Sequence, residues 1–355
     1  MTTQTKNEIL KSLAELILAN KQEIIAENKK DIASVPDLDA SLLDRLKVDE
    51  KKVDGMVSAT EQVISLPDPE GKVLYSGKHA NGMRIENRVV PFGNILIIYE
   101  SRPDVTVEAA ITAFKAGNKI ILKGGKEARL SNLKLVELWH KALEQHGEST
   151  SYVTYLDLPR EEVQKLIRNE RGEKVDLIIP RGGEGLINYI KQNSTAPVIV
   201  SGRGNNFLYV DADSDFDMAI NIILNGKSRL SVCNALDKVL FNENIEDLDV
   251  KIKSVYGKLE EMGIAVYGDK ATCDMNEKIE QITDDSIFAE EFLSAKILQS
   301  TVKDIDEAIE LINKYSGGHS AVIVTRNNDT AAKFQNEVDC AAVYHNASTR
   351  FTDGG

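Results

Sequence analysis

Cysteine is scarce in this chain of 355 residues, and its three copies, Cys233, Cys273 and Cys340, are scattered. An odd number of cysteines without a C-x-x-C pair excludes a disulfide framework and fits a reducing compartment. The five histidines show no spacing typical of metal ligands, and no G-x-S-x-G serine motif is present. We therefore expect a cytoplasmic protein that has no disulfide, no metal site and no serine nucleophile of that type.

Long apolar runs are also lacking, since none approaches the roughly 18 residues that a membrane span requires. The N-terminus, Met1-Thr-Thr-Gln-Thr-Lys6, is polar and differs from the apolar core of a signal peptide. Basic residues are outnumbered, with 43 Lys and Arg against 56 Asp and Glu, and the net charge is -13. This charge argues against nucleic acid and anionic membrane as partners, although a few local cations can still bind an anionic substrate.

The length and a hydrophobic content of 42% are sufficient for two domains with large cores. Apolar residues within 1–65 recur at helical spacing. After a Pro- and Gly-rich break at 66–71, residues 73–90 predict a β-hairpin that turns at Asn81-Gly82, because this pair suits the positive φ angles of a tight turn.

From residue 95 the pattern alternates between apolar strands and helices. Strands are expected at 95–99, 119–123, 152–157, 175–179, 197–200 and 207–210. Helices are expected at 105–116, 127–146, 161–169, 186–192 and 216–225, and a second strand–helix series at 238–346. Such alternation predicts a parallel sheet covered by helices on both faces.

One cysteine has a context that suits chemistry. Cys233 follows two cations, Lys227 and Arg229, and lies between a predicted helix and an apolar run. Nearby cations favour the thiolate, which is the form of cysteine that acts as a nucleophile. On this segment alone a buried packing role is the preferred interpretation, because free cysteine is among the most buried residue types.

Two glycine-rich turns each join a predicted strand to a helix. In Lys123-Gly-Gly-Lys126 the glycines and the helix N-terminus favour an anion, and the lysines suit a phosphate such as the 2′-phosphate of NADP. An ordinary loop with solvated lysines explains this turn equally well. The second turn, Pro180-Arg-Gly-Gly-Glu-Gly185, does not match the dinucleotide fingerprint G-x-G-x-x-G and is weak support by itself.

Three other segments have plain interpretations. Residues 211–217 resemble the start of a calcium loop, but Phe216 stands where that loop needs Gly, so a turn and helix cap are expected. His319 is predicted to be a turn residue rather than a substrate contact. Arg350 could pair with a carboxylate, although a surface loop is preferred on this segment alone.

Taken together, five segments resemble the gamma-glutamyl phosphate reductases, a family within the aldehyde dehydrogenase superfamily. They follow the family's order across almost the whole chain, and five long matches in register are far more specific than any one of them. The segments are Tyr99–Thr106, Ile121–Glu127, Leu177–Gly185, Ser231–Ala235 and Ala342–Gly354.

The resemblance implies an aldehyde dehydrogenase-like α/β fold. A Rossmann-type cofactor-binding domain would occupy residues 1–226, and an α/β catalytic domain would occupy residues 227–355. The hairpin at about 73–90 would project toward a partner subunit in a homo-oligomer. Members of the family normally continue beyond the position of Gly355, so the catalytic domain is expected to be truncated at its C-terminus.

The activity implied is the second step of proline biosynthesis, in which NADPH reduces L-glutamyl 5-phosphate to L-glutamate 5-semialdehyde and phosphate. Cys233 would be the catalytic nucleophile and would form a thioester. The implied cofactor-binding residues are Lys123, Gly124, Gly125, Lys126, Pro180, Arg181, Gly182, Gly183 and Glu291. The implied substrate-binding residues are Ser101, Arg102, Asn346, Ser348 and Arg350.

Two positions bear on the alternatives, which are an NAD-dependent aldehyde dehydrogenase and an inactive nucleotide-binding relative. Ile199 aligns with the glutamate that activates water in hydrolytic aldehyde dehydrogenases, and Lys126 aligns with an acid common in NAD-using relatives. The family often has Cys-His where this chain has Asn206-Phe207, so the resemblance gives these two side chains no role. A glutamate 5-kinase is a further partner that the resemblance allows.

Overall fold

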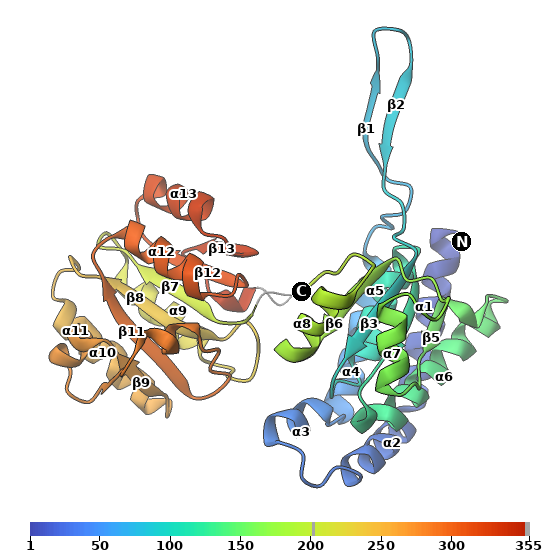
Figure 1. The fold of residues 1–355 in the computed structure, drawn as a ribbon, viewed down its shortest axis with the longest axis horizontal. Helices are drawn as coiled ribbons and strands as arrows, with labels where there is room; N and C mark the ends of the chain where they lie inside the picture. The colour runs from blue at the N-terminus through green and yellow to red at the C-terminus, as the bar shows by residue number, and fades with distance from the viewer. Residues whose placement is uncertain (201–202, 352–355) are drawn as a thin grey trace. The chain divides into compact units, whose positions relative to one another are not determined.

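The computed structural model describes residues 1–200 and 203–351. The chain divides into two compact units, Met1–Val200 and Ser201–Gly355 (Figure 1). No helix in the described ranges is both long enough and apolar enough to cross a bilayer.

The first unit contains a parallel sheet whose strands, in spatial order, are β5-β4-β3-β6. The strands are β3 (Asn94–Tyr99), β4 (Lys119–Lys123), β5 (Val153–Tyr155) and β6 (Leu177–Arg181). The helices are α1 (Thr3–Ala19), α2 (Lys21–Ala33), α3 (Ala40–Leu46), α4 (Glu50–Ser65), α5 (Val105–Lys115), α6 (Arg129–Gln145), α7 (Arg160–Ile167) and α8 (Glu184–Asn193), with 3-10 turns η1 (Lys126–Ala128) and η2 (Thr150–Tyr152).

Both faces of this sheet are covered, as the continuous apolar strands predicted. Successive residues of a strand point to opposite faces. Ile95, Ile97 and Tyr99 of β3 pack with α1, α4, α5 and α6, whereas Leu96 and Ile98 pack with α7 and α8. The first of these two clusters is the larger and has Trp139 at its centre.

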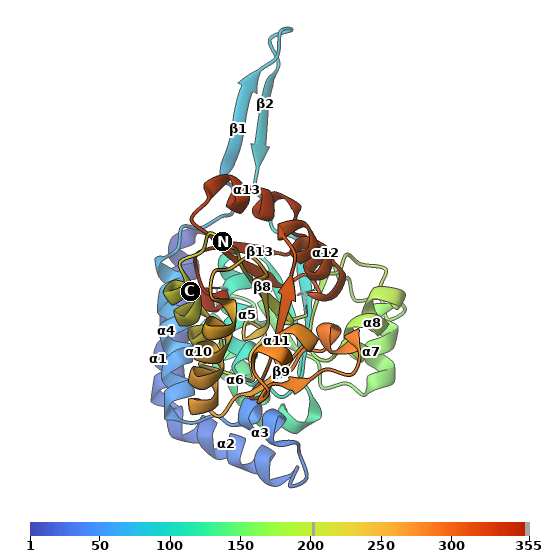
Figure 2. The same cartoon turned by 90° about the vertical axis from the view of Figure 1, so that its left-hand side faces the viewer.

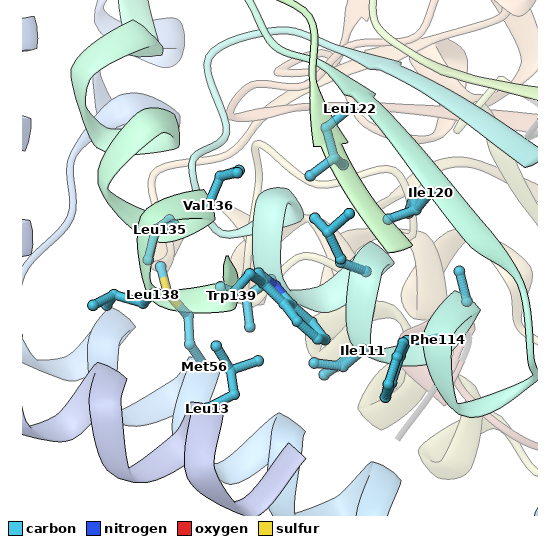
Figure 3. Close-up of a cluster of buried hydrophobic side chains, with 14 of the residues drawn as sticks. Leu13, Met56, Ile111, Phe114, Ile120, Leu122, Leu135, Val136, Leu138 and Trp139 are labelled. Atoms are coloured by element: carbon cyan, nitrogen blue, oxygen red, sulfur yellow. The ribbon is translucent and has the colours of Figure 1, made fainter. Parts of the chain in front are cut away.

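Figure 3 shows Trp139 of α6 among Leu13 of α1, Met56 of α4 and Phe114 of α5. The Trp139 and Phe114 rings meet edge to face, with their centroids 5.6 Å apart. Burying each such side chain contributes about 1.5–3 kcal/mol, so this cluster fixes α5 and α6 against one face of the sheet.

The predicted hairpin is present as β1 (Val73–Lys78) and β2 (Arg84–Arg88), which pair antiparallel. Its turn contains Gly82 at φ +90°, in the region that favours glycine. The hairpin extends away from the rest of its unit (Figure 2). Its apolar side chains are exposed, including Leu74 and Tyr75 at 61% each.

The second unit contains a larger parallel sheet in the order β10-β9-β11-β8-β7-β12-β13. The strands described within residues 203–351 are β7 (Asn206–Val210), β8 (Leu236–Asn242), β9 (Ala265–Gly268), β10 (Glu280–Gln281), β11 (Lys296–Val302), β12 (Ser320–Val324) and β13 (Ala342–His345). The helices are α9 (Phe216–Gly226), α10 (Leu248–Glu261), α11 (Lys270–Met275), α12 (Ile305–Tyr315) and α13 (Asn328–Glu337), with 3-10 turns η3 (Asp285–Ala289) and η4 (Thr349–Phe351).

The second sheet also buries both faces. Leu208 and Val210 of β7 pack with α9 and α10, and Phe207 and Tyr209 pack with α12 and α13. The cap expected near residue 216 is also present, because the Asp215 carboxylate accepts the amide of Met218 at the start of α9.

The structure differs from the expectation in one domain boundary and in one strand. We expected β7 and α9 within the domain of residues 1–226, but both pack in the second unit, because β7 pairs with β8 and β12 at the centre of that sheet. The strand expected at 197–200 is reduced to a single bridge between Val198 and Ile178.

Candidate active site

Cys233 lies on the loop between α9 and β8, and its side chain is exposed. This exposure excludes the packing role that the segment alone favoured. The side-chain amide of Asn206, at the start of β7, holds the backbone of this loop. Its Nδ2 donates to the carbonyl oxygens of Cys233 and Ala235, at 2.8 and 2.7 Å. A buried side chain of the sheet therefore fixes the backbone that carries the thiol.

Gly204 lets the chain pass directly under Cys233. A Cβ on Gly204 would lie 2.6 Å from the Cys233 Cα, closer than real Cβ contacts allow. The Gly204 amide donates to Oε1 of Glu291 at 3.1 Å. Gly204 thus joins the nucleophile loop to Glu291, the residue predicted to bind the nicotinamide ribose.

The segment that carries Glu291 is anchored on the first residues of β8. Lys238 Nζ donates to the Glu290 carbonyl at 2.8 Å and lies 3.6 Å from the centroid of the Phe292 ring. The Asp237 carboxylate accepts the Phe292 amide at 2.8 Å. Burial lowers the pKa of Lys238 to about 7, because a charged amine is disfavoured away from water.

Lys227 lies in a buried ion pair, although its position before Cys233 suggested that it would favour the thiolate. Its side chain is buried and pairs with the Asp237 carboxylate at 3.3 Å, where it also donates to the Ser294 carbonyl at 3.4 Å. A buried charge needs a partner of opposite sign, and Asp237 supplies it. Arg229, the other upstream cation, is exposed. The activation expected from Lys227 is therefore corrected to an anchoring role for the Glu291 segment.

The C-terminal predicted substrate segment packs beside the Cys233 loop. Arg350 Nη1 donates to Oδ1 of Asn234, the residue after Cys233, and Thr349 Oγ1 donates to the Asn234 carbonyl at 2.7 Å. Ser348 Oγ accepts the Arg350 amide at 3.2 Å. Residues 352–354 of the matching segment lie outside the described residues.

Asn346, another predicted substrate residue, has its side chain on a neighbouring backbone. Its Oδ1 accepts the Thr325 amide at 3.1 Å, and its Nδ2 donates to the Thr325 carbonyl at 3.0 Å. This pairing ties the end of β13 to the end of β12. The side chain of Asn346 therefore joins two strand ends, whereas the side chain of Arg350 contacts Asn234, the residue next to Cys233.

The predicted cofactor residues of the first unit gather at one edge of its sheet. The carboxyl ends of β4, β3 and β6 are neighbours there, because these strands are parallel. The β4 end leads into the turn of residues 123–126, and the β6 end into the turn of residues 180–183. Ser101 and Arg102 follow β3 between them.

The turn after β4 is shaped by close backbone packing. The amide of Asn132 leaves no room for a Cβ on Gly124. Lys123 Nζ donates to the Gly124 carbonyl at 2.7 Å, and burial lowers the pKa of Lys123. Lys126 is exposed. Glu127, which follows, accepts from Ser101 with one carboxylate oxygen, at 2.7 Å from the amide and 2.9 Å from the hydroxyl.

The turn after β6 is bonded to the end of β3. The Gly183 amide at the start of α8 donates to Oε2 of Glu100 at 3.1 Å. A Cβ on Gly182 would lie 2.8 Å from this same carboxylate. Pro180 pairs with Ile98 within the sheet, and Arg181 is exposed. The two turns and Ser101 are thus linked by the two acids, Glu100 and Glu127.

Three buried residues that contact the Cys233 loop or the Glu291 segment were not predicted as site residues. They are Asn206, Asp237 and Lys238. Asn206 begins a buried strand, and Asp237 and Lys238 are adjacent ionisable residues within the apolar run of β8. Two ionisable residues within an apolar strand are a signal in the sequence that could have identified Asp237 and Lys238. Such residues are almost never fully buried unless they have partners. His319, predicted to be a turn residue, is buried with Nδ1 3.1 Å from the Asn206 Oδ1.

Comparison with known proteins gives the class of this chain. The model of the aldehyde dehydrogenase family matches residues 1–265 and 280–354. A propionaldehyde dehydrogenase from a Clostridium phytofermentans microcompartment superposes with a TM-score of 0.69 at 15% identity, covering 100% of this chain and 86% of that chain. This likeness shows the shared fold, as predicted from the sequence.

Nearer relatives narrow the class. Gamma-glutamyl phosphate reductase of Clostridium botulinum (strain Eklund 17B / Type B) is 43% identical over 99% of this chain and 85% of the relative. The enzyme of that name from Nitratiruptor sp. is 44% identical over the same shares. The crystal structure of gamma-glutamyl phosphate reductase from Thermotoga maritima superposes with a TM-score of 0.93 at 40% identity, covering 100% of this chain and 86% of that chain. The chain therefore belongs to the aldehyde dehydrogenase family and, within it, to the gamma-glutamyl phosphate reductases.

Proposed function

We propose that this chain is an oxidoreductase that converts L-glutamyl 5-phosphate to L-glutamate 5-semialdehyde and phosphate with NADPH, the second step of proline biosynthesis. The observation that carries this proposal is the exposed Cys233 thiol on a loop fixed by buried contacts beside Glu291 and Arg350. The relatives of the same family, at 43% and 44% identity, support the substrate class.

In the proposed reaction the Cys233 thiolate attacks the carbonyl carbon of the acyl phosphate. The bond from that carbon to the phosphate oxygen breaks, phosphate leaves, and a thioester forms on sulfur. Bound NADPH would supply the hydride that reduces this thioester to the aldehyde level. The oxyanion that develops in each acyl step needs preplaced donors, and the Cys233 amide is a candidate.

The residues of the first unit fit a nucleotide with an extra phosphate. The tightly packed Gly124 allows close backbone approach, and Lys126 places an exposed cation at the start of η1. The acid beside them, Glu127, is held by Ser101. This arrangement supports NADPH, because a cation at that position pairs with a 2′-phosphate.

The reverse reaction tests the proposal most directly. Glutamate semialdehyde, phosphate and NADP+ are mixed with the protein, and NADPH absorbance is followed beside the Cys233→Ala variant. NADPH formation that requires phosphate and vanishes in the variant is expected. Formation without phosphate would instead identify a hydrolytic aldehyde dehydrogenase, and NADP+ binding without turnover would identify an inactive relative.

We propose in addition that the hairpin joins two or more copies of the chain. A two-stranded ribbon is marginal by itself, and its exposed Leu74, Tyr75 and Ile85 would be covered by a second subunit. Light scattering is expected to give an oligomer that Leu74→Asp/Tyr75→Asp weakens; a monomeric wild-type protein would contradict this. A cytoplasmic location and a glutamate 5-kinase as partner, which would supply the acyl phosphate, complete the proposal.

A further inference from the structure

Asn206 lies where three backbone segments of the second unit meet. It is fully buried, and its Nδ2 is within 2.8 Å of three carbonyl oxygens, those of Gly204, Cys233 and Ala235. Its Oδ1 accepts from Ser320 Oγ at 2.6 Å and lies 3.1 Å from His319 Nδ1. Both ends of the amide are therefore saturated, and their partners fix which way the amide points.

An amide of this length satisfies both sets of partners. A carboxylate would place an oxygen against three carbonyl oxygens, and an aliphatic side chain would leave these buried groups without a donor. The carbonyls belong to the Cys233 loop and to Gly204, whereas Ser320 is the first residue of β12 and His319 precedes it. Asn206 thus connects the Cys233 loop to the rigid sheet.

We propose that Asn206 is a positioning residue for the Cys233 nucleophile, with Ser320 and His319 holding the amide in place. This inference rests on the proposed function only in taking Cys233 as the attacking group. Holding the carbonyls of Cys233 and Ala235 fixes the peptide plane between Cys233 and Asn234 and the plane between Ala235 and Leu236, and this restricts the direction of the Cys233 side chain. A misplacement of about 1 Å at a reacting group can cost on the order of 100-fold in rate.

The adjacent residue provides a matched control. Asn205 is also fully buried and donates through Nδ2 to two carbonyls, those of Phe288 and Tyr315, at 2.7 and 2.8 Å. Its Nδ2 makes comparable buried hydrogen bonds, and neither of them reaches the Cys233 loop. Asn205→Ala therefore reproduces the loss of a buried amide without releasing the nucleophile.

The test uses a readout that does not depend on turnover. Iodoacetamide labelling of Cys233 is followed by mass spectrometry in Asn206→Ala, Asn205→Ala and the wild-type protein. Cys233 is exposed, and burial raises the pKa of Cys273 and Cys340, so the three thiols are separable. We expect Asn206→Ala to slow labelling of Cys233 at least threefold and to lower kcat at least 30-fold, with KM for NADP+ within twofold. Asn205→Ala should keep the labelling rate within twofold.

Labelling of Cys233 that is unchanged or faster in Asn206→Ala, or equally slowed in Asn205→Ala, would overturn the proposal. If Asn206→Ala does not fold, Ser320→Ala removes the 2.6 Å hydrogen bond that orients the amide while Asn206 remains. It is expected to slow labelling in the same direction by about twofold to threefold, and an unchanged rate overturns the proposal. Full turnover by Cys233→Ala would refute the proposed nucleophile, whereas the labelling rates still decide whether Asn206 positions this loop.

Discussion

The two candidate sites are built in different ways. The turns of the first unit are placed by the ends of neighbouring strands, and the groups expected to meet a ligand, such as Lys126 and Arg181, are exposed. The Cys233 loop is instead held by buried polar contacts between residues far apart in the chain, such as Asn206 with Cys233 and Thr349 with Asn234. Strand ends suffice to gather a binding surface, whereas a nucleophile needs an oriented backbone.

The largest effect is expected at the reacting atom. Cys233→Ala removes the sulfur that would form the thioester, so kcat should fall by about six orders of magnitude, as when a serine nucleophile is deleted alone. Binding of NADP+, measured by calorimetry, should stay within twofold of wild type. Cys340→Ala is the control, since this thiol contacts Ser316 and is half-buried. Turnover in Cys233→Ala above 1% of wild type would exclude the thioester route.

The difference between the two sites also explains what the sequence could predict. Periodicity and turn residues are local signals, so they located the hairpin, the glycine-rich turns and the strands other than the one expected at 197–200. The partners of Lys227 are Asp237 and Ser294, and the latter is 67 residues away, so its position before Cys233 suggested a role that its contacts do not support. Asn206 was missed for the same reason, because its contacts form only when β7 lies beneath the loop.

The second prediction concerns the buried pair beneath the Glu291 segment. Asp237→Ala would leave the buried Lys227 amine and the Phe292 amide without their acceptor, which should cost about 3–5 kcal/mol. Hydrogen exchange of peptides from β8 and β11 measures this loss in the second unit. Fluorescence of Trp139, the single tryptophan of the chain, should report unchanged unfolding of the first unit.

A surface pair supplies the contrast for that measurement. Lys270 and Asp274 pair across one helical turn and are both well exposed, so Asp274→Ala should cost less than about 0.5 kcal/mol. Equal losses for Asp237→Ala and Asp274→Ala would mean that the buried pair does not anchor the Glu291 segment.

The third prediction uses the titration of Lys238. Its pKa is about 7 in the folded protein and near 10.5 when unfolded, so between these values the unfolded chain binds the extra proton. Stability therefore rises with pH across this window. The free energy of unfolding of wild type relative to Lys238→Met should increase by roughly 2 kcal/mol from pH 7.5 to 9.5, since each pH unit contributes at most about 1.4 kcal/mol. Lys227 and Asp237, the charged neighbours, are common to both proteins. A difference that is flat with pH would show that Lys238 is charged throughout.

The smallest effect is expected in the first unit, where exposed groups bind by charge and the backbone is already fixed by the sheet. Lys126→Ala should raise KM for NADP+ about tenfold, which corresponds to about 1.4 kcal/mol, and should leave KM for NAD+ within twofold. The exposed Lys191 on α8 is a control for the loss of one positive charge, and Lys191→Ala should change neither value. Equal weakening of NADP+ and NAD+ by Lys126→Ala would mean that Lys126 does not contact the 2′-phosphate. The proposed preference for NADPH would then depend on Lys123 instead, whose Nζ is bonded to the Gly124 carbonyl.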